Sequence, residues 1–127
     1  MLSESETPLA LVVEDDQATQ GLISTVLSEE GFRVDEADNG EQALEFLNRQ
    51  PYDVIVLDLQ IPYVSGFQII ARMRDDFPGS LPAVVITSGL DVQILGHLAT
   101  LCTVLPKPLD VSKLRRFAKE RVAEKLR

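Results

Sequence analysis

Apolar residues along the chain follow two patterns that alternate with each other. Five segments have the pattern of strands: three are continuous apolar runs, one alternates apolar and polar residues, and the last is a short, mostly apolar segment. They are residues 9–13, 32–36, 54–57, 83–86 and 102–105. Five segments carry apolar residues at helical spacing; they are residues 17–30, 41–49, 67–76, 91–99 and those from about 110 onward. This alternation predicts an α/β fold with a parallel sheet covered by helices on both faces.

Charged and hydroxyl residues stand where four of these strands end. In chain order they are the acidic run 14–16, Asp58, Thr87 and Lys107. The carboxyl ends of parallel strands lie at one edge of a sheet, which is where α/β folds place their chemistry. The sequence therefore predicts a cluster of acids at that edge, flanked by a hydroxyl group and one lysine.

Each of these residues also has a simpler role open to it. The acidic run can cap the following helix, and Asp58 can cap a turn. Thr87 can merely finish a strand, and Lys107, between two prolines, can be an exposed loop lysine. Because all four positions coincide with strand ends, a shared site accounts for them together.

The predicted cluster favours phosphoryl chemistry with a divalent cation. Closely placed carboxylates repel one another, and a cation offsets that repulsion. Mg²⁺ takes oxygen ligands and binds through one or two carboxylates together with phosphate oxygens. Asp58 could then attack a phosphorus atom as a carboxylate nucleophile. Mg²⁺, Lys107 and the Thr87 hydroxyl would meet the charge on the transferring phosphoryl oxygens.

Composition limits the setting in which this chemistry takes place. The 127 residues suit one domain with one core, expected over residues 9–127, with residues 1–8 as a flexible tail. The single cysteine rules out an internal disulfide and fits a reducing compartment. No apolar run approaches the length of a membrane span, and the acidic, polar start does not resemble a signal peptide. We expect a cytoplasmic protein that does not bind membranes.

Charge is distributed unevenly along the chain. The net charge of -8 argues against direct nucleic acid binding by the domain. Residues 113–127 nevertheless hold seven of the 12 Lys and Arg residues. We interpret this basic end as a solvated helix whose cations favour its C-terminal dipole, in preference to a patch for a partner.

Four short motifs resemble the receiver domain of two-component response regulators. They are LVVEDD at 11–16, VLDLQIPYVSG at 56–66, VITSG at 85–89 and LPKP at 105–108. The resemblance runs from residue 9 to about residue 119, nearly the whole chain. It implies a flavodoxin-like fold with a five-stranded parallel sheet. It also supplies the strand order 2-1-3-4-5, which the pattern alone does not, and which is a known order of flavodoxins and receivers.

The resemblance also implies a role for each site residue. Asp58 would accept a phosphoryl group from a phosphohistidine of a sensor histidine kinase or phosphotransfer protein. Glu14 and Asp15 match the family's acidic pair. Asp15 and Asp58 would bind Mg²⁺ by carboxylate, Glu14 would reach the metal through water, and Gln60 would bind it by its backbone carbonyl.

The residues that end the fourth and fifth strands complete the implied site. Thr87 and Lys107 match the residues that contact the phosphoryl group, and the Lys107–Pro108 bond would be cis as in relatives. Phosphorylation would alter a face that binds an output domain, an effector protein or a second copy. Val104 departs from the family, which usually has Tyr or Phe there, so the usual aromatic switch is not expected.

Other functions are compatible with parts of this pattern. A degenerate receiver would bind proteins without phosphorylation, but it would not need Asp15, Asp58, Thr87 and Lys107 together. A flavodoxin would need a hydroxyl- and glycine-rich loop after the first strand, where this chain has three acids. A haloacid-dehalogenase-type phosphatase would need a second Asp at position 60, where Gln60 cannot titrate. We therefore expect a regulatory phosphoacceptor and not an enzyme.

Overall fold

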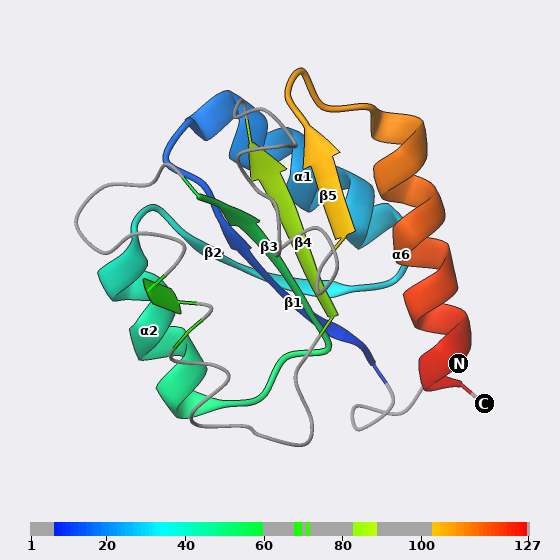
Figure 1. Ribbon diagram of the computed structural model, residues 1–127. Helices are drawn as coiled ribbons and strands as arrows, with labels where there is room; N and C mark the ends of the chain where they lie inside the picture. Colours follow the sequence, from blue (N-terminus) through cyan, green and yellow to red (C-terminus); the bar gives the residue numbers. More distant parts are fainter. Residues whose placement is uncertain (1–6, 60–67, 70, 72–82, 89–102, 127) are drawn as a thin grey trace.

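The fold is a single five-stranded parallel sheet with helices on both faces (Figure 1). The computed structural model describes residues 7–59, 68, 69, 71, 83–88 and 103–126. The strands are β1 (Leu9–Val13), β2 (Arg33–Ala37), β3 (Val54–Asp58), β4 (Ala83–Ser88) and β5 (Thr103–Pro106). The helices are α1 (Gln17–Glu29), α2 (Gly40–Arg49) and α6 (Val111–Lys125).

The strand order is β2-β1-β3-β4-β5, and every neighbouring pair is parallel. The expected fold class and strand order are therefore confirmed. The helices predicted over 67–76 and 91–99 lie outside the described residues, apart from 68, 69 and 71, which are helical. Among the helices of the described residues, none is long and apolar enough to cross a membrane.

Alternate residues of β1 and β3 pack into two separate cores. Leu11 and Ile55 face α2, where Leu47 closes one cluster. Val12 and Val56 face the opposite side, where α1 and α6 complete a second cluster. The period of two along a strand sends successive side chains to opposite faces, so a strand covered on both sides must be apolar throughout. This explains why β3 is buried along its whole length.

The way α1 ends moves the start of β2 by one residue from its predicted position. Gly31 has a φ of 104°, and its N–H donates to the Ser28 carbonyl at 3.1 Å. The Phe32 N–H donates to the Leu27 carbonyl at 3.0 Å, which completes a Schellman motif. Phe32 therefore belongs to the helix terminus, and β2 begins at Arg33 instead of residue 32.

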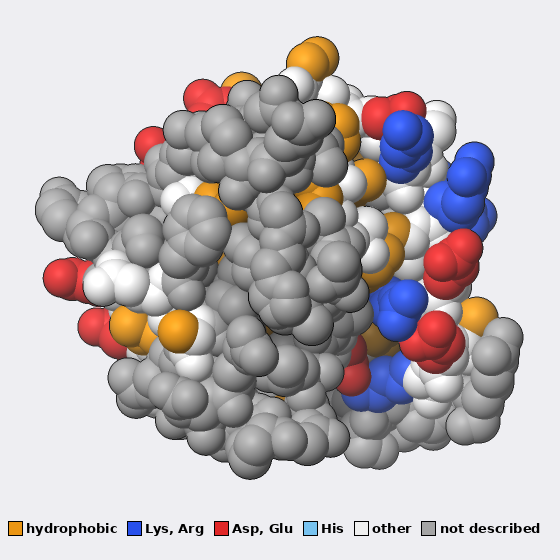
Figure 2. All heavy atoms as spheres, viewed as in Figure 1, with side chains coloured by type: hydrophobic (Ala, Val, Ile, Leu, Met, Phe, Trp, Pro, Cys, Tyr) orange, Lys and Arg blue, Asp and Glu red, His pale blue; other side chains and the backbone are white. Residues whose placement is uncertain are grey.

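Ion pairs hold α6 against α1 and against the amino-terminal end of β3. Arg115 contacts Glu29 at 3.0 Å and Glu30 at 2.8 Å, both at the C-terminal end of α1. Lys125 pairs with Asp53 at 2.9 Å, and Asp53 also accepts the Leu9 N–H at 2.8 Å. Figure 2 shows basic and acidic side chains interspersed over α6. Part of the basic segment is therefore neutralised within the protein.

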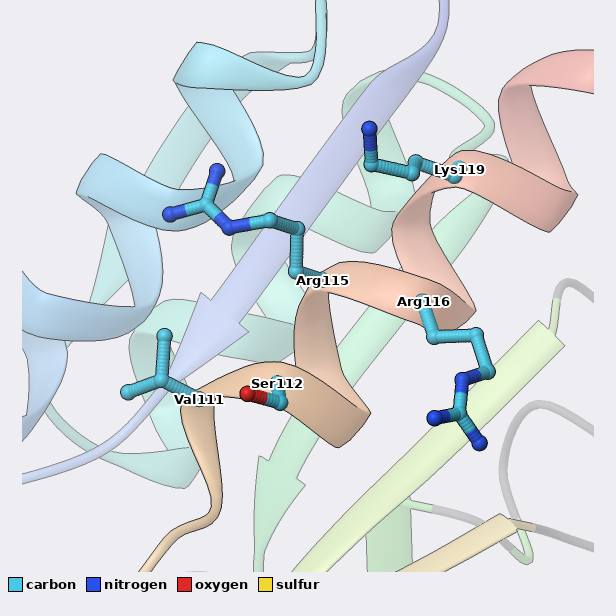
Figure 3. Close-up of a pocket in the computed structure, with 5 residues that line it drawn as sticks. All are labelled: Val111, Ser112, Arg115, Arg116 and Lys119. Atoms are coloured by element: carbon cyan, nitrogen blue, oxygen red, sulfur yellow. The ribbon is translucent and has the colours of Figure 1, made fainter.

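A surface hollow of about 320 Å³ lies along the first half of α6 and is lined by Val111, Ser112, Arg115, Arg116 and Lys119 (Figure 3). In Figure 3 the Arg115 side chain extends toward α1 and the Arg116 side chain extends in the opposite direction. Lys119 lies 3.5 Å from Glu30. Two of the three cations of the hollow are thus paired with acids of α1, and we assign the hollow to the junction of the two helices.

The two-sided core predicts a large effect of truncation in β3. Ile55 is fully buried, so Ile55→Ala removes methyl groups that no neighbour can replace. We expect the free energy of unfolding to fall by about 2–5 kcal/mol, measured by urea denaturation. Leu22→Ala on α1, where Leu22 is 42% exposed, is the control and should change it by less than about 0.5 kcal/mol. Equal effects at the two positions would contradict the assignment of the core.

Candidate functional site

Asp58 is the last residue of β3 and lies at the carboxyl edge of the sheet. It is only 3% exposed although it carries a carboxylate. β3 lies between β1 and β4, and Asp58 is paired in register with Thr87 of β4. Asp58 was expected where this strand ends, and the hydrogen-bonded ladder with β4 confirms it as the last paired residue of β3. The parallel register therefore brings Asp58 and Thr87 to the same level of the edge.

The acidic run at the end of β1 divides into residues with different environments. Glu14 is 1% exposed, and its N–H donates to the Ala37 carbonyl at 3.1 Å. Asp15 is exposed. Carboxylate oxygens of Glu14, Asp15 and Asp58 all lie within 4.8 Å of one another. Asp16 instead caps α1, and its side chain accepts the Thr19 N–H at 2.9 Å. One member of the run thus takes the capping role and two join Asp58.

Lys107 completes the cluster from the loop that follows β5. Its Nζ donates to both Glu14 carboxylate oxygens at 3.2 Å and to Asp58 Oδ2 at 3.1 Å. The Lys107–Pro108 peptide bond is cis. Lys107 is therefore not a loop lysine directed to solvent, because its ammonium group joins two buried carboxylates from different strands.

The charges of this cluster alter the protonation of its members. Burial raises the pKa of the Glu14 carboxyl above its usual 4.5, and repulsion from Asp58 raises it further, while Lys107 acts in the opposite direction. Burial alone would lower the pKa of Lys107, but hydrogen bonds and attraction to Asp58 and Glu14 raise it above its usual value. Lys107 is therefore a firmly charged cation between two acids.

Thr87 places a hydroxyl group at the same edge. The residue is 1% exposed, and its Oγ1 has no hydrogen-bond partner among the residues that the structure describes. A buried hydroxyl without a partner is costly, and a ligand atom can satisfy it. Gln60, the remaining predicted site residue, lies outside the described residues.

One buried polar residue beside the cluster was not predicted. Gln20 of α1 is 4% exposed, and its Nε2 donates to the Glu14 carbonyl at 3.1 Å. A glutamine in a helix looks like a surface residue in sequence. Only the packing of α1 against the ends of β1 and β2 reveals this contact, so no signal in the pattern could have found it.

Residues 10–119 match the family model of the response regulator receiver domain. This chain belongs to that family. The receiver was expected from its strand-end residues, and the match extends over nearly all of the described sheet.

Relatives of the receiver differ in length. This receiver is 38% identical over 106 residues to the transcriptional regulatory protein PcoR of Escherichia coli. The aligned region covers 82% of the receiver and 46% of PcoR. The receiver is 27% identical over 112 residues to sporulation initiation phosphotransferase F of Bacillus subtilis. That aligned region covers 87% of the receiver and 90% of the phosphotransferase. The receiver spans about half or less of the transcriptional regulators it matches.

A solved structure supports the same relationship. The receiver domain of Francisella response regulator 1452 superposes with a TM-score of 0.80 at 28% sequence identity. The superposition covers 92% of this receiver and 98% of the Francisella domain. The family and the flavodoxin-like fold are therefore established by sequence and by structure together.

The environment of Glu14 predicts how the metal-free receiver responds to pH. Its raised folded-state pKa means that folding favours the protonated carboxyl. The protonated carboxyl therefore adds to the free energy of unfolding. This addition is fully present below pH 4.5, the usual pKa, and is lost as the pH rises through the folded-state pKa. We therefore expect Glu14→Gln to increase the free energy of unfolding at pH 7, and the gain to shrink as the pH falls toward 4.5.

Urea denaturation in a chelator, over a series of pH values, measures this difference. Glu45→Gln, which removes an exposed carboxylate on α2, is the matched control and should change the free energy of unfolding by less than about 0.5 kcal/mol throughout. A loss of stability in Glu14→Gln at pH 7 would show that the ion pair with Lys107 outweighs the cost of burying Glu14.

Proposed function

We propose that this receiver accepts a phosphoryl group on Asp58 from the phosphohistidine of a sensor histidine kinase or phosphotransfer protein. The observation that carries the proposal is the position of the Lys107 ammonium, 3.1 Å from Asp58 Oδ2 and 3.2 Å from the Glu14 oxygens. A buried carboxylate next to a fixed cation at the edge of a parallel sheet suits attack on an electrophile that carries negative charge.

In the proposed transfer, a carboxylate oxygen of Asp58 forms a bond to phosphorus and the phosphorus–nitrogen bond to histidine breaks. The three remaining phosphoryl oxygens carry the charge, and fixed positive groups stabilise it. Lys107 is already held within reach of Asp58 by Glu14, so it needs little reorganisation. The Thr87 hydroxyl, at the same level of the sheet, would donate to a phosphoryl oxygen and gain the partner that the described residues do not provide.

The acidic cluster fits a hard divalent cation, for which we propose Mg²⁺. The oxygens of three carboxylates lie within 4.8 Å of one another, and Lys107 pairs with two of them, Glu14 and Asp58. Among the described residues, this leaves excess negative charge at the cluster. All the donors are oxygens, as Mg²⁺ prefers. Asp15 and Asp58 would bind it by carboxylate, Glu14 would bind through water, and the Gln60 carbonyl would be a further ligand. Bound Mg²⁺ would neutralise charge on the carboxylates and phosphoryl oxygens.

The receiver would act as a regulatory phosphoacceptor and not as an enzyme with turnover. We propose that residues 9–127 form the receiver domain after a flexible tail at 1–8, and that it works in the cytoplasm. Its output would be contact with an effector protein, an output domain or a second copy. Relatives named as transcriptional regulators support an output domain, and the relative named as a sporulation phosphotransferase supports a relay role.

The response to phosphorylation is proposed to differ from that of receivers with an aromatic residue on the last strand. Val104 of β5 is half-buried and packs against the core cluster on the α2 face. Its short β-branched side chain is restricted at χ1 and cannot swing as a ring does. Any change in the partner-binding face must therefore use other groups near Lys107 and Thr87.

Intact mass after incubation with a small phosphodonor and Mg²⁺ tests the transfer. We expect one added phosphoryl group in the wild-type receiver and none without Mg²⁺ or in Asp58→Asn, which lacks the nucleophile. Asp16→Asn is the matched control, since Asn keeps the helix cap and Asp16 lies outside the carboxylate cluster. If the folded wild type gains no mass from small donors or from a histidine kinase, a phosphorylation-independent binding module becomes the better account.

Thr87→Val separates the role of the hydroxyl in transfer from its role in folding. Valine has a similar shape and removes only the unpartnered Oγ1. We expect the rate of phosphorylation to fall on the order of 10²-fold, the size typical of losing one donor to a developing charge. The free energy of unfolding of the metal-free receiver should stay the same or rise by about 1 kcal/mol. An unchanged rate would remove Thr87 from the proposed site.

A further inference from the structure

The side-chain amide of Gln20 lies behind the acidic cluster, on the side of α1. Its Nε2 is 3.1 Å from the Glu14 carbonyl, 3.3 Å from the Ala37 carbonyl and 2.9 Å from Asp38 Oδ1. The residue is 4% exposed. One buried amide group thus joins α1 to the carboxyl ends of β1 and β2. Its two N–H donors are shared among three acceptors.

This contact fixes the backbone that carries the acids. The Glu14 N–H is held by the Ala37 carbonyl at 3.1 Å, and the Glu14 carbonyl is held by Gln20. The Glu14 carbonyl belongs to the peptide group that joins Glu14 to Asp15. Both sides of Glu14 are therefore anchored, and the direction in which Glu14 and Asp15 present their carboxylates depends on that anchored peptide.

We infer that Gln20 is a positioning residue for the acidic cluster, holding the Glu14–Asp15 peptide so that both carboxylates meet Asp58. This inference rests on the proposed Mg²⁺ site, and it concerns a residue that would not itself contact the cation. Groups that orient metal ligands from behind commonly change metal affinity by about 10–100-fold when they are lost.

The groups around position 20 require a hydrogen-bond donor, which the Gln20 amide supplies. All the groups around Nε2 are acceptors, two of them carbonyls and one a carboxylate. A glutamate here would add a negative charge facing those acceptors. An apolar side chain would fill the space but would leave the Glu14 carbonyl without this donor, and the peptide would lose one of the contacts that orient it.

Gln17 offers a matched control on the same helix. Its Nε2 donates to Asp38 Oδ1 at 3.2 Å, the same oxygen that Gln20 contacts. Gln17 is exposed and makes no contact with the Glu14 carbonyl among the described residues. A variant of Gln17 therefore removes an amide contact to Asp38 while it leaves the anchor of Glu14 in place.

Calorimetric titration of the metal-free receiver with Mg²⁺ tests the inference. Gln20→Met keeps the length and volume of the side chain and removes both donors. We expect its dissociation constant for Mg²⁺ to rise about 10-fold or more relative to wild type. Gln17→Met should bind within about twofold of wild type, and each titration is run well below the measured unfolding midpoint of its variant.

Phosphorylation kinetics give a second reading that a purely structural role would not change. In Gln20→Met the Mg²⁺ concentration for half-maximal rate should rise by the same factor as the dissociation constant. The maximal rate at saturating Mg²⁺ should stay within about threefold of wild type, because Asp58, Thr87 and Lys107 are intact. A fall in the maximal rate with unchanged Mg²⁺ dependence would overturn the inference.

The remaining outcomes are also decisive. If Gln20→Met does not fold, Gln20→Asn replaces it, because its amide is one methylene too short to reach the Glu14 carbonyl, and the same loss of affinity is expected. Wild-type affinity in the folded Gln20 variant overturns the positioning role while the proposed function stands. Failure of the wild-type receiver to bind Mg²⁺ overturns the proposed metal site itself and this inference with it.

Discussion

The ammonium group of Lys107, held between the buried carboxylates of Glu14 and Asp58, is the interaction on which the site depends. The three residues come from the ends of β1 and β3 and from the loop after β5. This contact therefore joins segments that are far apart in sequence at the carboxyl edge of the sheet. Two nearly buried acids would repel each other without a cation. One lysine offsets that repulsion only in part, which is why burial and Asp58 still raise the pKa of Glu14.

Because Lys107 neutralises only part of the negative charge, the site can still bind a cation and respond to a phosphoryl group. A fully neutralised cluster would have little reason to bind a cation or an anionic phosphoryl group. Here three carboxylates cluster and Lys107 pairs with two of them, and the Thr87 hydroxyl is buried with no partner among the described residues. The rest of the fold supports this charged edge. Two apolar cores lie below it, the Asp16 cap starts α1 beside it, and the ion pairs of Arg115 hold α6 behind it.

Local sequence signals predicted the elements well where one physical effect dominates. Continuous apolar runs marked β1, β3 and β4, because strands covered on both faces must be apolar along most of their length. Boundaries were less accurate where two effects compete. Phe32 is apolar enough to begin a strand, but the Schellman motif at Gly31 keeps its N–H in the helix terminus. No such competition arises at the end of β3, where Asp58 follows the apolar run and is the last residue of the strand, as predicted.

The sequence by itself determined the alternation of strands and helices, the buried strands and the strand ends at which Glu14, Asp58, Thr87 and Lys107 stand. These follow from short-range periodicity and from the geometry of parallel sheets. Only the tertiary structure decided which acid caps α1 and which two join Asp58, that Lys107 contacts both buried carboxylates, and that Gln20 reaches the Glu14 carbonyl. Those outcomes depend on distances between side chains from different elements, and residue type and spacing along one chain do not specify them.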